Sequence, residues 1–202
     1  AGSTAASIDA KPYAIEAAKG AVADHLKKHG FKHFQITSTR ACATIFRIRY
    51  QILGDPKISI VIANKDHVED LKRCITSIQK NSTWSNYEII VVDDGSSDDT
   101  AQTVIDTFDL HAVERPVQRR IGCQPALALY ENGSGGVPIT LVKKQNGGKA
   151  DALNMGINVS HYPYFLCIDA DSVLQHDSLE KIVRPVLEDD TVVAVGGAVR
   201  PA

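Results

Sequence analysis

From residue 57 onward, short apolar segments alternate with segments that have helical spacing, and this alternation constrains the fold most. Residues 58–63, 87–92 and 138–143 are apolar enough for buried strands, and helical patterns follow each of them. A further strand is expected at 164–168, then a helix from 178 and another strand at 192–195. Such alternation is typical of a mostly parallel sheet with helices on its faces. We therefore predict an α/β fold for this part.

The residues before this alternation predict a small α-β-β extension over 8–55. Apolar residues recur on one face of a helix at 9–29, and residues 33–39 and 43–52 look like two short strands. Residues 54–56 (Gly-Asp-Pro) form a turn that marks a boundary. Residues 1–7 have the composition of an artificial linker. We thus expect a linker at 1–7, the extension at 8–55 and the main domain at 56–202.

Composition excludes several kinds of partner and site. The formal net charge of -2 gives no reason to expect nucleic acid, and the seven His show no metal-ligand spacing. No apolar run reaches the length of a membrane span, so no transmembrane segment is expected in this chain. The four Cys lack Cys-x-x-Cys spacing, and Cys74 and Cys167 fall at core positions. This favours reduced thiols in the cytoplasm.

Two carboxylates, Asp169 and Asp171, directly follow the apolar run 164–168. Because that run is so apolar, we expect a strand covered on both faces that delivers these residues to a sheet edge. Ligands of open α/β sheets bind at the carboxyl ends of the strands. Mg²⁺ commonly binds through one or two carboxylates together with substrate phosphates. A solvated Asp-x-Asp turn without a ligand is the competing interpretation.

Three other segments carry polar groups to the same predicted edge. Asn64 follows the first strand, Asp93 and Asp94 end the second, and Gly147-Gly148-Lys149 opens a helix. A helix N-terminus offers N–H groups and partial positive charge to a phosphate, and Lys149 adds a full charge. The convergence predicts a site for a nucleotide diphosphate beside a metal. Neither a Walker motif nor a dinucleotide-binding glycine pattern is present.

Some local predictions concern the connections. Asp66, with Glu69 three residues later, fits a capping box for the helix that ends near residue 81. Asp151 and Asn154 share a helix face and either line the site or are solvated. Residues 110–136 interrupt the alternation and are expected to be a long loop.

Four motifs in this order resemble glycosyltransferase family 2, which has the GT-A fold. They are the strand at 58–62, Val-Val-Asp-Asp-Gly-Ser at 91–96, Asn-Gly-Gly-Lys-Ala-Asp-Ala-Leu-Asn at 146–154 and Asp-Ala-Asp-Ser at 169–172. The resemblance spans roughly residues 56–200. It implies an inverting transferase of bacterial polysaccharide synthesis that uses a nucleotide sugar, often UDP-linked, with Mg²⁺ or Mn²⁺ and a glycan acceptor.

The resemblance also assigns roles to individual residues. Ala63 and Asn64 would line the nucleotide pocket, and Asp93 and Asp94 would contact base and ribose. Lys149 would approach the diphosphate, Asp169 would hold ribose or sugar and help bind the metal, and Asp171 would ligate the metal.

The chain departs from the family pattern at two places. The first strand ends in Ala63, where Pro is usual. Family members also carry a catalytic carboxylate well beyond the Asp-x-Asp, and no residue after 199 supplies one, so the chain resembles a truncated donor half. Two alternatives remain open: a part of an active glycosyltransferase, or a non-catalytic nucleotide-binding fragment without the base. A sugar-nucleotide pyrophosphorylase is disfavoured because its Gly-rich loop is missing.

The two parts of the chain resemble different branches of the family. Up to about residue 108 the sequence is similar to soluble transferases of the rhamnosyl type. From about residue 110 it is similar to membrane-embedded synthases of poly-N-acetylglucosamine or hyaluronan. The resemblance implies a domain on the cytoplasmic side of a membrane-associated parent protein.

Overall fold

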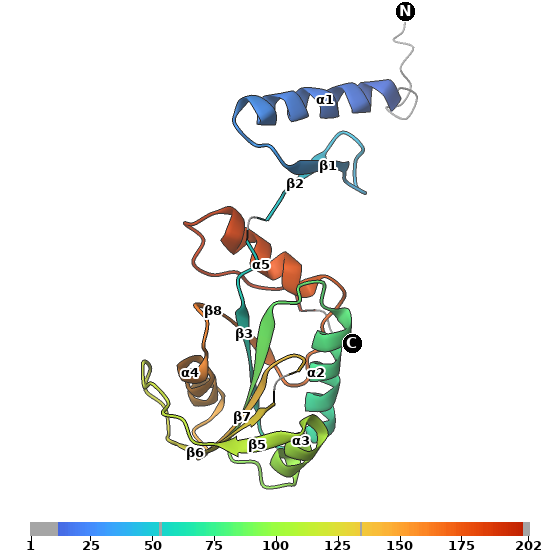
Figure 1. Ribbon diagram of the computed structural model, residues 1–202. Coiled ribbons are helices and arrows are strands. Elements are labelled where there is room, and N and C mark those ends of the chain that lie inside the picture. Colours follow the sequence, from blue (N-terminus) through green and yellow to red (C-terminus); the bar gives the residue numbers. More distant parts are fainter. Residues whose placement is uncertain (1–11, 53, 134, 200–202) are drawn as a thin grey trace, which may run out of the picture. The chain divides into compact units, whose positions relative to one another are not determined.

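The computed structural model describes residues 12–52, 54–133 and 135–199. It divides into two compact units, one formed by 1–53 with 187–191 and the other by 54–186 with 192–202. Figure 1 shows the elements of both units.

The smaller unit contains one helix and a hairpin, as predicted. Helix α1 (Pro12–Lys28) precedes strands β1 (Phe34–Ser38) and β2 (Phe46–Tyr50), which pair antiparallel with Ile36 opposite Ile48. Exposure alternates along β2, because one face of the hairpin is half-buried and the other carries Arg47 and Arg49. Residues 9–11 of the predicted helix lie outside the described residues.

The larger unit is built on a six-stranded sheet, which confirms the predicted α/β class. The strand order is β5-β6-β7-β4-β3-β8. The neighbouring strands β7, β4, β3 and β8 run parallel, and β6 is antiparallel to both of its neighbours. The strands have these bounds: β3 Ile58–Asn64, β4 Tyr87–Asp93, β5 Leu110–Val113, β6 Ala126–Asn132, β7 Ile139–Lys144 and β8 Tyr164–Asp169.

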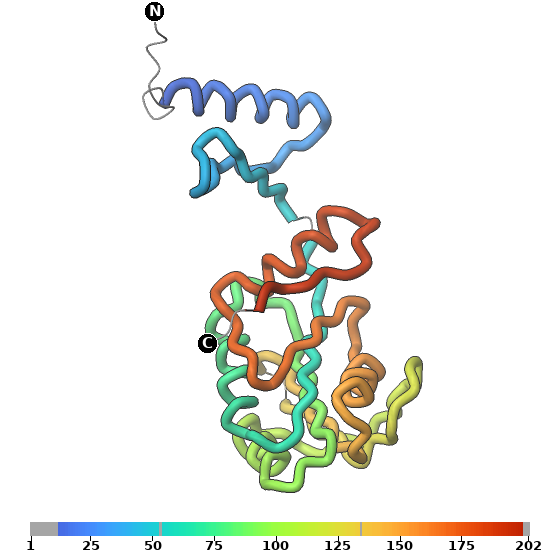
Figure 2. Tube along the Cα trace, turned by 180° about the vertical axis from the view of Figure 1, so that it is seen from behind, coloured from blue at the N-terminus to red at the C-terminus, as the bar shows by residue number. Residues whose placement is uncertain are grey.

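Helices lie on both faces of this sheet (Figures 1 and 2). α2 (Val68–Asn81) and α3 (Thr100–Phe108) cover one face, and α4 (Lys149–Val159) covers the other. α5 (Ser178–Glu188) begins beside the end of α2, because Asn81 donates a 2.6 Å hydrogen bond to the Leu174 carbonyl. The apolar pattern of α2 predicted which face of this helix packs on the sheet. Its buried residues include Leu71, Cys74, Ile75 and Ile78.

The core is deepest where α4 crosses the central strands. Ile90 and Val92 of β4 pack with Ala152, Met155 and Val159 of α4. A Cβ on Gly156 would collide with the side chain of Val61, which is fully buried on β3. Glycine at this position therefore permits the close approach that fixes α4, and with it the helix start at residue 149.

The prediction of a long loop over 110–136 was wrong. This segment contains β5 and β6, which pair from Leu110 opposite Asn132 to Val113 opposite Leu129. Both strands were hard to recognise because they are short or half-exposed: only Leu129 of β6 is buried. These two antiparallel strands lack the continuous apolar run of the buried parallel strands β3 and β4.

The prediction that β8 is covered on both faces was also wrong. β8 is an edge strand that pairs only with β3, and the Phe165 side chain is 50% exposed. Cys167, expected in the core, is consequently exposed, whereas Cys74 is buried as predicted. The expected strand at 192–195 is absent from the described structure, where these residues form neither helix nor strand.

Candidate functional site at the strand ends

The loops that follow β3 and β4 are joined by hydrogen bonds. The Asp66 carboxylate accepts from the Ser97 backbone N–H at 2.8 Å, and the Asp66 N–H donates to the Ser96 hydroxyl at 2.7 Å. The predicted capping box is therefore wrong: the residue before α2 is His67, whose side chain makes no capping hydrogen bond. Asp66 instead bridges two loops, which holds the ends of both strands in register.

Asn64 and Asp93 end adjacent strands and lie opposite one another in the register. Both are buried, and Asn64 donates 2.9 Å to the carbonyl of Asp66. One oxygen of Asp93 accepts from the Ser96 N–H at 3.0 Å. The other, Oδ2, has no hydrogen bond to any described residue. Ala63 lies one residue earlier on β3, between Val92 and Asp169 of the neighbouring strands.

Asp94 is buried and holds the glycine loop that precedes α4. Its Oδ1 accepts from the Gly147 N–H at 3.0 Å, and its Oδ2 accepts from the Gly148 N–H at 2.7 Å. Lys144 donates a further hydrogen bond to Oδ1. Three donors thus occupy three of the roughly four acceptor positions of a carboxylate. Ala152 is the first residue of α4 whose N–H bonds within the helix, to the Gly148 carbonyl at 3.0 Å, so the N–H groups of the first turn, from Lys149 on, have no partner within the helix.

Lys144 is a site residue that sequence reasoning missed. Its side chain is fully buried, and its ammonium lies 2.6 Å from Asp151 and also contacts Asp94. Burial alone would lower the pKa of Lys144, but hydrogen bonds to Asp151 and Asp94 outweigh it and hold that pKa above its ordinary value. The hydrogen bond from Lys144 in turn lowers the pKa of Asp151. Lys144 and Asp151 are therefore both charged at neutral pH.

Asp151 and Asn154 neither line an open site nor lie free in solvent. Asp151 accepts from the Gln124 N–H at 2.9 Å, and Asn154 donates 3.1 Å to the Gly122 carbonyl. Asn158, one turn further on the same helix, accepts from two backbone N–H groups at 2.9 Å, those of Arg120 and Ile121. These three side chains together fasten residues 120–124 along α4.

Lys149 and Asp169 come together at the end of β8, as the convergence argument predicts. Their side chains lie 2.6 Å apart and are 63% and 54% exposed, so both remain accessible to a ligand. Burial, followed by the nearby charges of Asp171 and Asp169, raises the pKa of the Cys74 thiol to about 12. Cys74 beneath this edge therefore stays protonated at neutral pH.

Asp169 and Asp171 could hold a metal only with help from other ligands. Among the described residues, no three His, Cys, Asp or Glu side chains lie close enough to bind one by themselves. Two exposed carboxylates fit Mg²⁺ or Mn²⁺ when phosphate oxygens complete the coordination. The chemistry of the donor set therefore suits a metal that arrives with a diphosphate.

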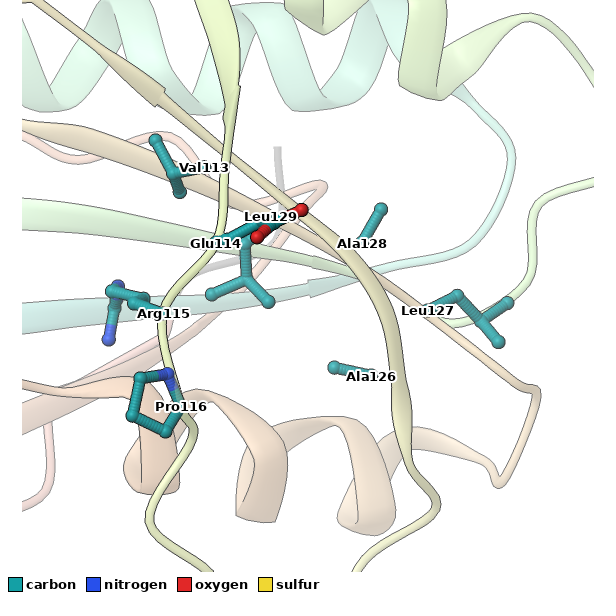
Figure 3. Close-up of a pocket in the computed structure, with 8 residues that line it drawn as sticks. All are labelled: Val113, Glu114, Arg115, Pro116, Ala126, Leu127, Ala128 and Leu129. Atoms are coloured by element: carbon teal, nitrogen blue, oxygen red, sulfur yellow. The ribbon is translucent and has the colours of Figure 1, made fainter.

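A shallow hollow of about 430 Å³ lies beyond these strand ends, where β5 and β6 diverge (Figure 3). Val113 to Pro116 form one wall, and Ala126 to Leu129 form the other. Arg115, on the first of these walls, donates a 2.7 Å hydrogen bond to Glu131 of β6. The hollow borders the site, because Ala126 pairs with Lys144, but it contains none of the predicted site residues.

No helix in the described part of the chain is both long and apolar enough to cross a membrane.

Comparison with known proteins identifies a family and several relatives. The family model described as glycosyl transferase family 2 matches residues 59–201. The glycosyltransferase GlyG of Streptococcus pneumoniae is 29% identical over 139 residues, which cover 69% of this chain and 38% of GlyG. The poly-beta-1,6-N-acetyl-D-glucosamine synthase of Staphylococcus aureus is 25% identical over 162 residues, or 74% of this chain and 32% of the synthase.

Among solved structures, the mannosyltransferase PcManGT of Pyrobaculum calidifontis, in complex with GDP-Man and Mn²⁺, aligns with a TM-score of 0.49 at 17% identity. That alignment covers 87% of this chain and 41% of PcManGT.

The matched part of this chain therefore spans about a third of the length of these two curated relatives, 38% of one and 32% of the other. The family match covers well over half of the chain and includes every strand end described above. The prediction from the four motifs is thus confirmed: the chain belongs to glycosyl transferase family 2.

Proposed function

We propose that the strand-end edge of the larger unit binds the diphosphate of a nucleotide sugar, with a UDP-linked sugar as the first candidate. The observation that carries this proposal is the convergence of β3, β4, β8 and the start of α4 at one edge. The first turn of α4 offers backbone N–H groups and the exposed Lys149 ammonium to a diphosphate. Asp169 and Asp171 lie beside it with carboxylates that suit a divalent metal.

In this proposal the nucleoside lies over the ends of β3 and β4. Ala63 and Asn64 form the wall, and Oδ2 of Asp93 is available to accept from a base N–H or a ribose hydroxyl. Asp94 has one acceptor position left beside the three donors it already holds, so its contact with the nucleotide is at most a single hydrogen bond.

Lys149 changes its ion-pair partner when the nucleotide sugar binds. Its ammonium is paired with Asp169 at 2.6 Å, and a diphosphate would compete with Asp169 for it. This exchange would release Asp169 towards ribose, sugar or Mg²⁺ or Mn²⁺. When bound with Asp171 and Asp169, such a metal supplies positive charge that offsets the charge of the diphosphate.

For the whole protein we propose inverting transfer of the sugar to a glycan acceptor, as in polysaccharide synthesis. That reaction needs a base for the acceptor hydroxyl, and none of the residues placed at this edge is assigned that role. The donor half is the part that this chain supports.

Calorimetric titration with UDP, with and without Mn²⁺, tests the proposal. We expect UDP to bind more tightly with Mn²⁺, and Asp171→Ala to remove that gain while leaving the metal-free affinity close to that of the unaltered chain. Asp55→Ala, on the turn before β3 and remote from the strand ends, is the matched control. If UDP does not bind in either condition, the proposed function is refuted.

A further inference from the structure

We propose that Lys144 is a positioning residue for the diphosphate site. Held between Asp94 and Asp151, it would fix the loop at Gly147 and Gly148 and thereby aim the first turn of α4 and Lys149 at the phosphates. This inference rests on the proposed function, because it concerns how the same site is held in place.

Lys144 cannot touch a ligand itself. Its side chain is fully buried, whereas that of Lys149, which would make the contact, is 63% exposed. The Lys144 ammonium also donates 2.6 Å to the Gln145 carbonyl, so its three protons have three acceptors: Asp94, Asp151 and this carbonyl. Because each of its protons has an acceptor, the buried ammonium is held in one position. It therefore suits a role in fixing its neighbours and not in binding a ligand.

Both partners of Lys144 act directly on the glycine loop. Asp94 accepts the backbone N–H groups of Gly147 and Gly148. Asp151 fills the space beside Gly147, where a Cβ would collide with its carboxylate. Gly148 has φ 86°, a conformation that L side chains rarely adopt. Asp94 and Asp151 thus constrain the loop from two sides, and Lys144 contacts both of them.

Without Lys144, two carboxylates would face each other around a buried position with no cation between them. The hydrogen bonds that join Asp94 to Asp151 through the ammonium would be lost, and the two carboxylates would also repel each other, so the loop attached to Asp94 would move relative to α4, which carries Asp151. The N–H groups of the first turn would then miss the phosphates, while the nucleoside contacts at β3 and β4 would be unaffected. The inference therefore predicts a defect specific to phosphate.

The test compares the affinity for UDP with the affinity for uridine, which lacks the phosphates, by NMR titration with Mg²⁺ present. Lys144→Met should weaken UDP binding at least about tenfold, the size found when groups that orient metal ligands are removed. Its affinity for uridine should stay within about twofold of that of the unaltered chain. Lys80→Met, the same change at an exposed residue on the last turn of α2, is the control and should alter neither affinity.

A second variant separates position from net charge and covers the case in which Lys144→Met does not fold. Lys144→Met combined with Asp151→Asn restores the net charge and removes the facing carboxylate pair. The inference predicts that this double variant still binds UDP weakly. Recovery of full UDP affinity in the double variant, an equal loss for UDP and uridine, or unchanged UDP affinity in both variants would overturn it. Failure of the unaltered chain to bind UDP would instead overturn the proposed function on which it rests.

Discussion

The close approach of α4 to β3 makes Gly156→Ala the sharpest test of the packing that positions the site. The added methyl would collide with the fully buried Val61 side chain. Overpacking of this kind costs about 1 to 3 kcal/mol, and the better helix propensity of Ala returns about 1 kcal/mol. Because the collision is severe, we expect the upper part of that range and a net loss of about 1 to 2 kcal/mol.

A double-mutant cycle identifies the partner. Val61→Ala alone removes two methyl groups and should cost about 2 to 3 kcal/mol, including the cavity. In the double variant the methyl of residue 156 enters the space left at residue 61, so the combined loss should be smaller than the sum by about 1 to 2 kcal/mol.

Urea unfolding followed by the fluorescence of Trp84, the single tryptophan, measures these changes. Trp84 belongs to the larger unit and is buried, so its signal reports the unit that contains Gly156 and Val61. The reasoning is refuted if Gly156→Ala is as stable as the unaltered chain, or if the two changes are additive.

Three further predictions concern single side chains. Asp151→Asn should cost stability at neutral pH because Lys144 holds the pKa of Asp151 below its ordinary 3.8. This contribution is complete above that value and is lost as the pH falls through the lowered pKa, so unfolding curves of the two chains should converge in acid. Glu88→Gln should lower the free energy of unfolding by about 1 to 3 kcal/mol, because the buried carboxylate accepts three hydrogen bonds. Its UDP affinity, measured by calorimetry, should not change because Glu88 lies at the opposite end of β4 from the site. A changed UDP affinity would contradict this. Asn158→Ala should speed tryptic cleavage after Arg120 about tenfold by freeing the segment that Asn158 holds, and an unchanged cleavage rate would show that the segment is held by other contacts.

The central strands and the convergence of the site could be predicted because the evidence for them is local in sequence. β3 and β4 are continuous apolar runs, and the polar residues that follow them must meet at one edge of a parallel sheet. Neither inference needs knowledge of long-range contacts. The same reasoning predicted that Lys149 and Asp169 reach one edge, where their side chains lie 2.6 Å apart.

What could not be predicted depends on contacts between distant segments. β8 has the apolar composition of a central strand, but the pairing order makes it the outermost strand of the sheet. Lys144 follows an apolar strand and looks like a solvated lysine. Its burial depends on Asp94, fifty residues earlier, and on Asp151. The one local signal is that Lys144 alternates with Val142 and so points to the same buried face of β7.

The most direct test of the central claim is to map UDP on the chain by ¹H–¹⁵N NMR with Mg²⁺. The backbone amides of Lys149 and Ala150 should shift most, together with those at the ends of β3 and β4. Uridine should shift the strand ends but leave the amides of α4 in place. Shifts confined to the hollow between Val113 and Leu129, with none at the start of α4, would contradict it.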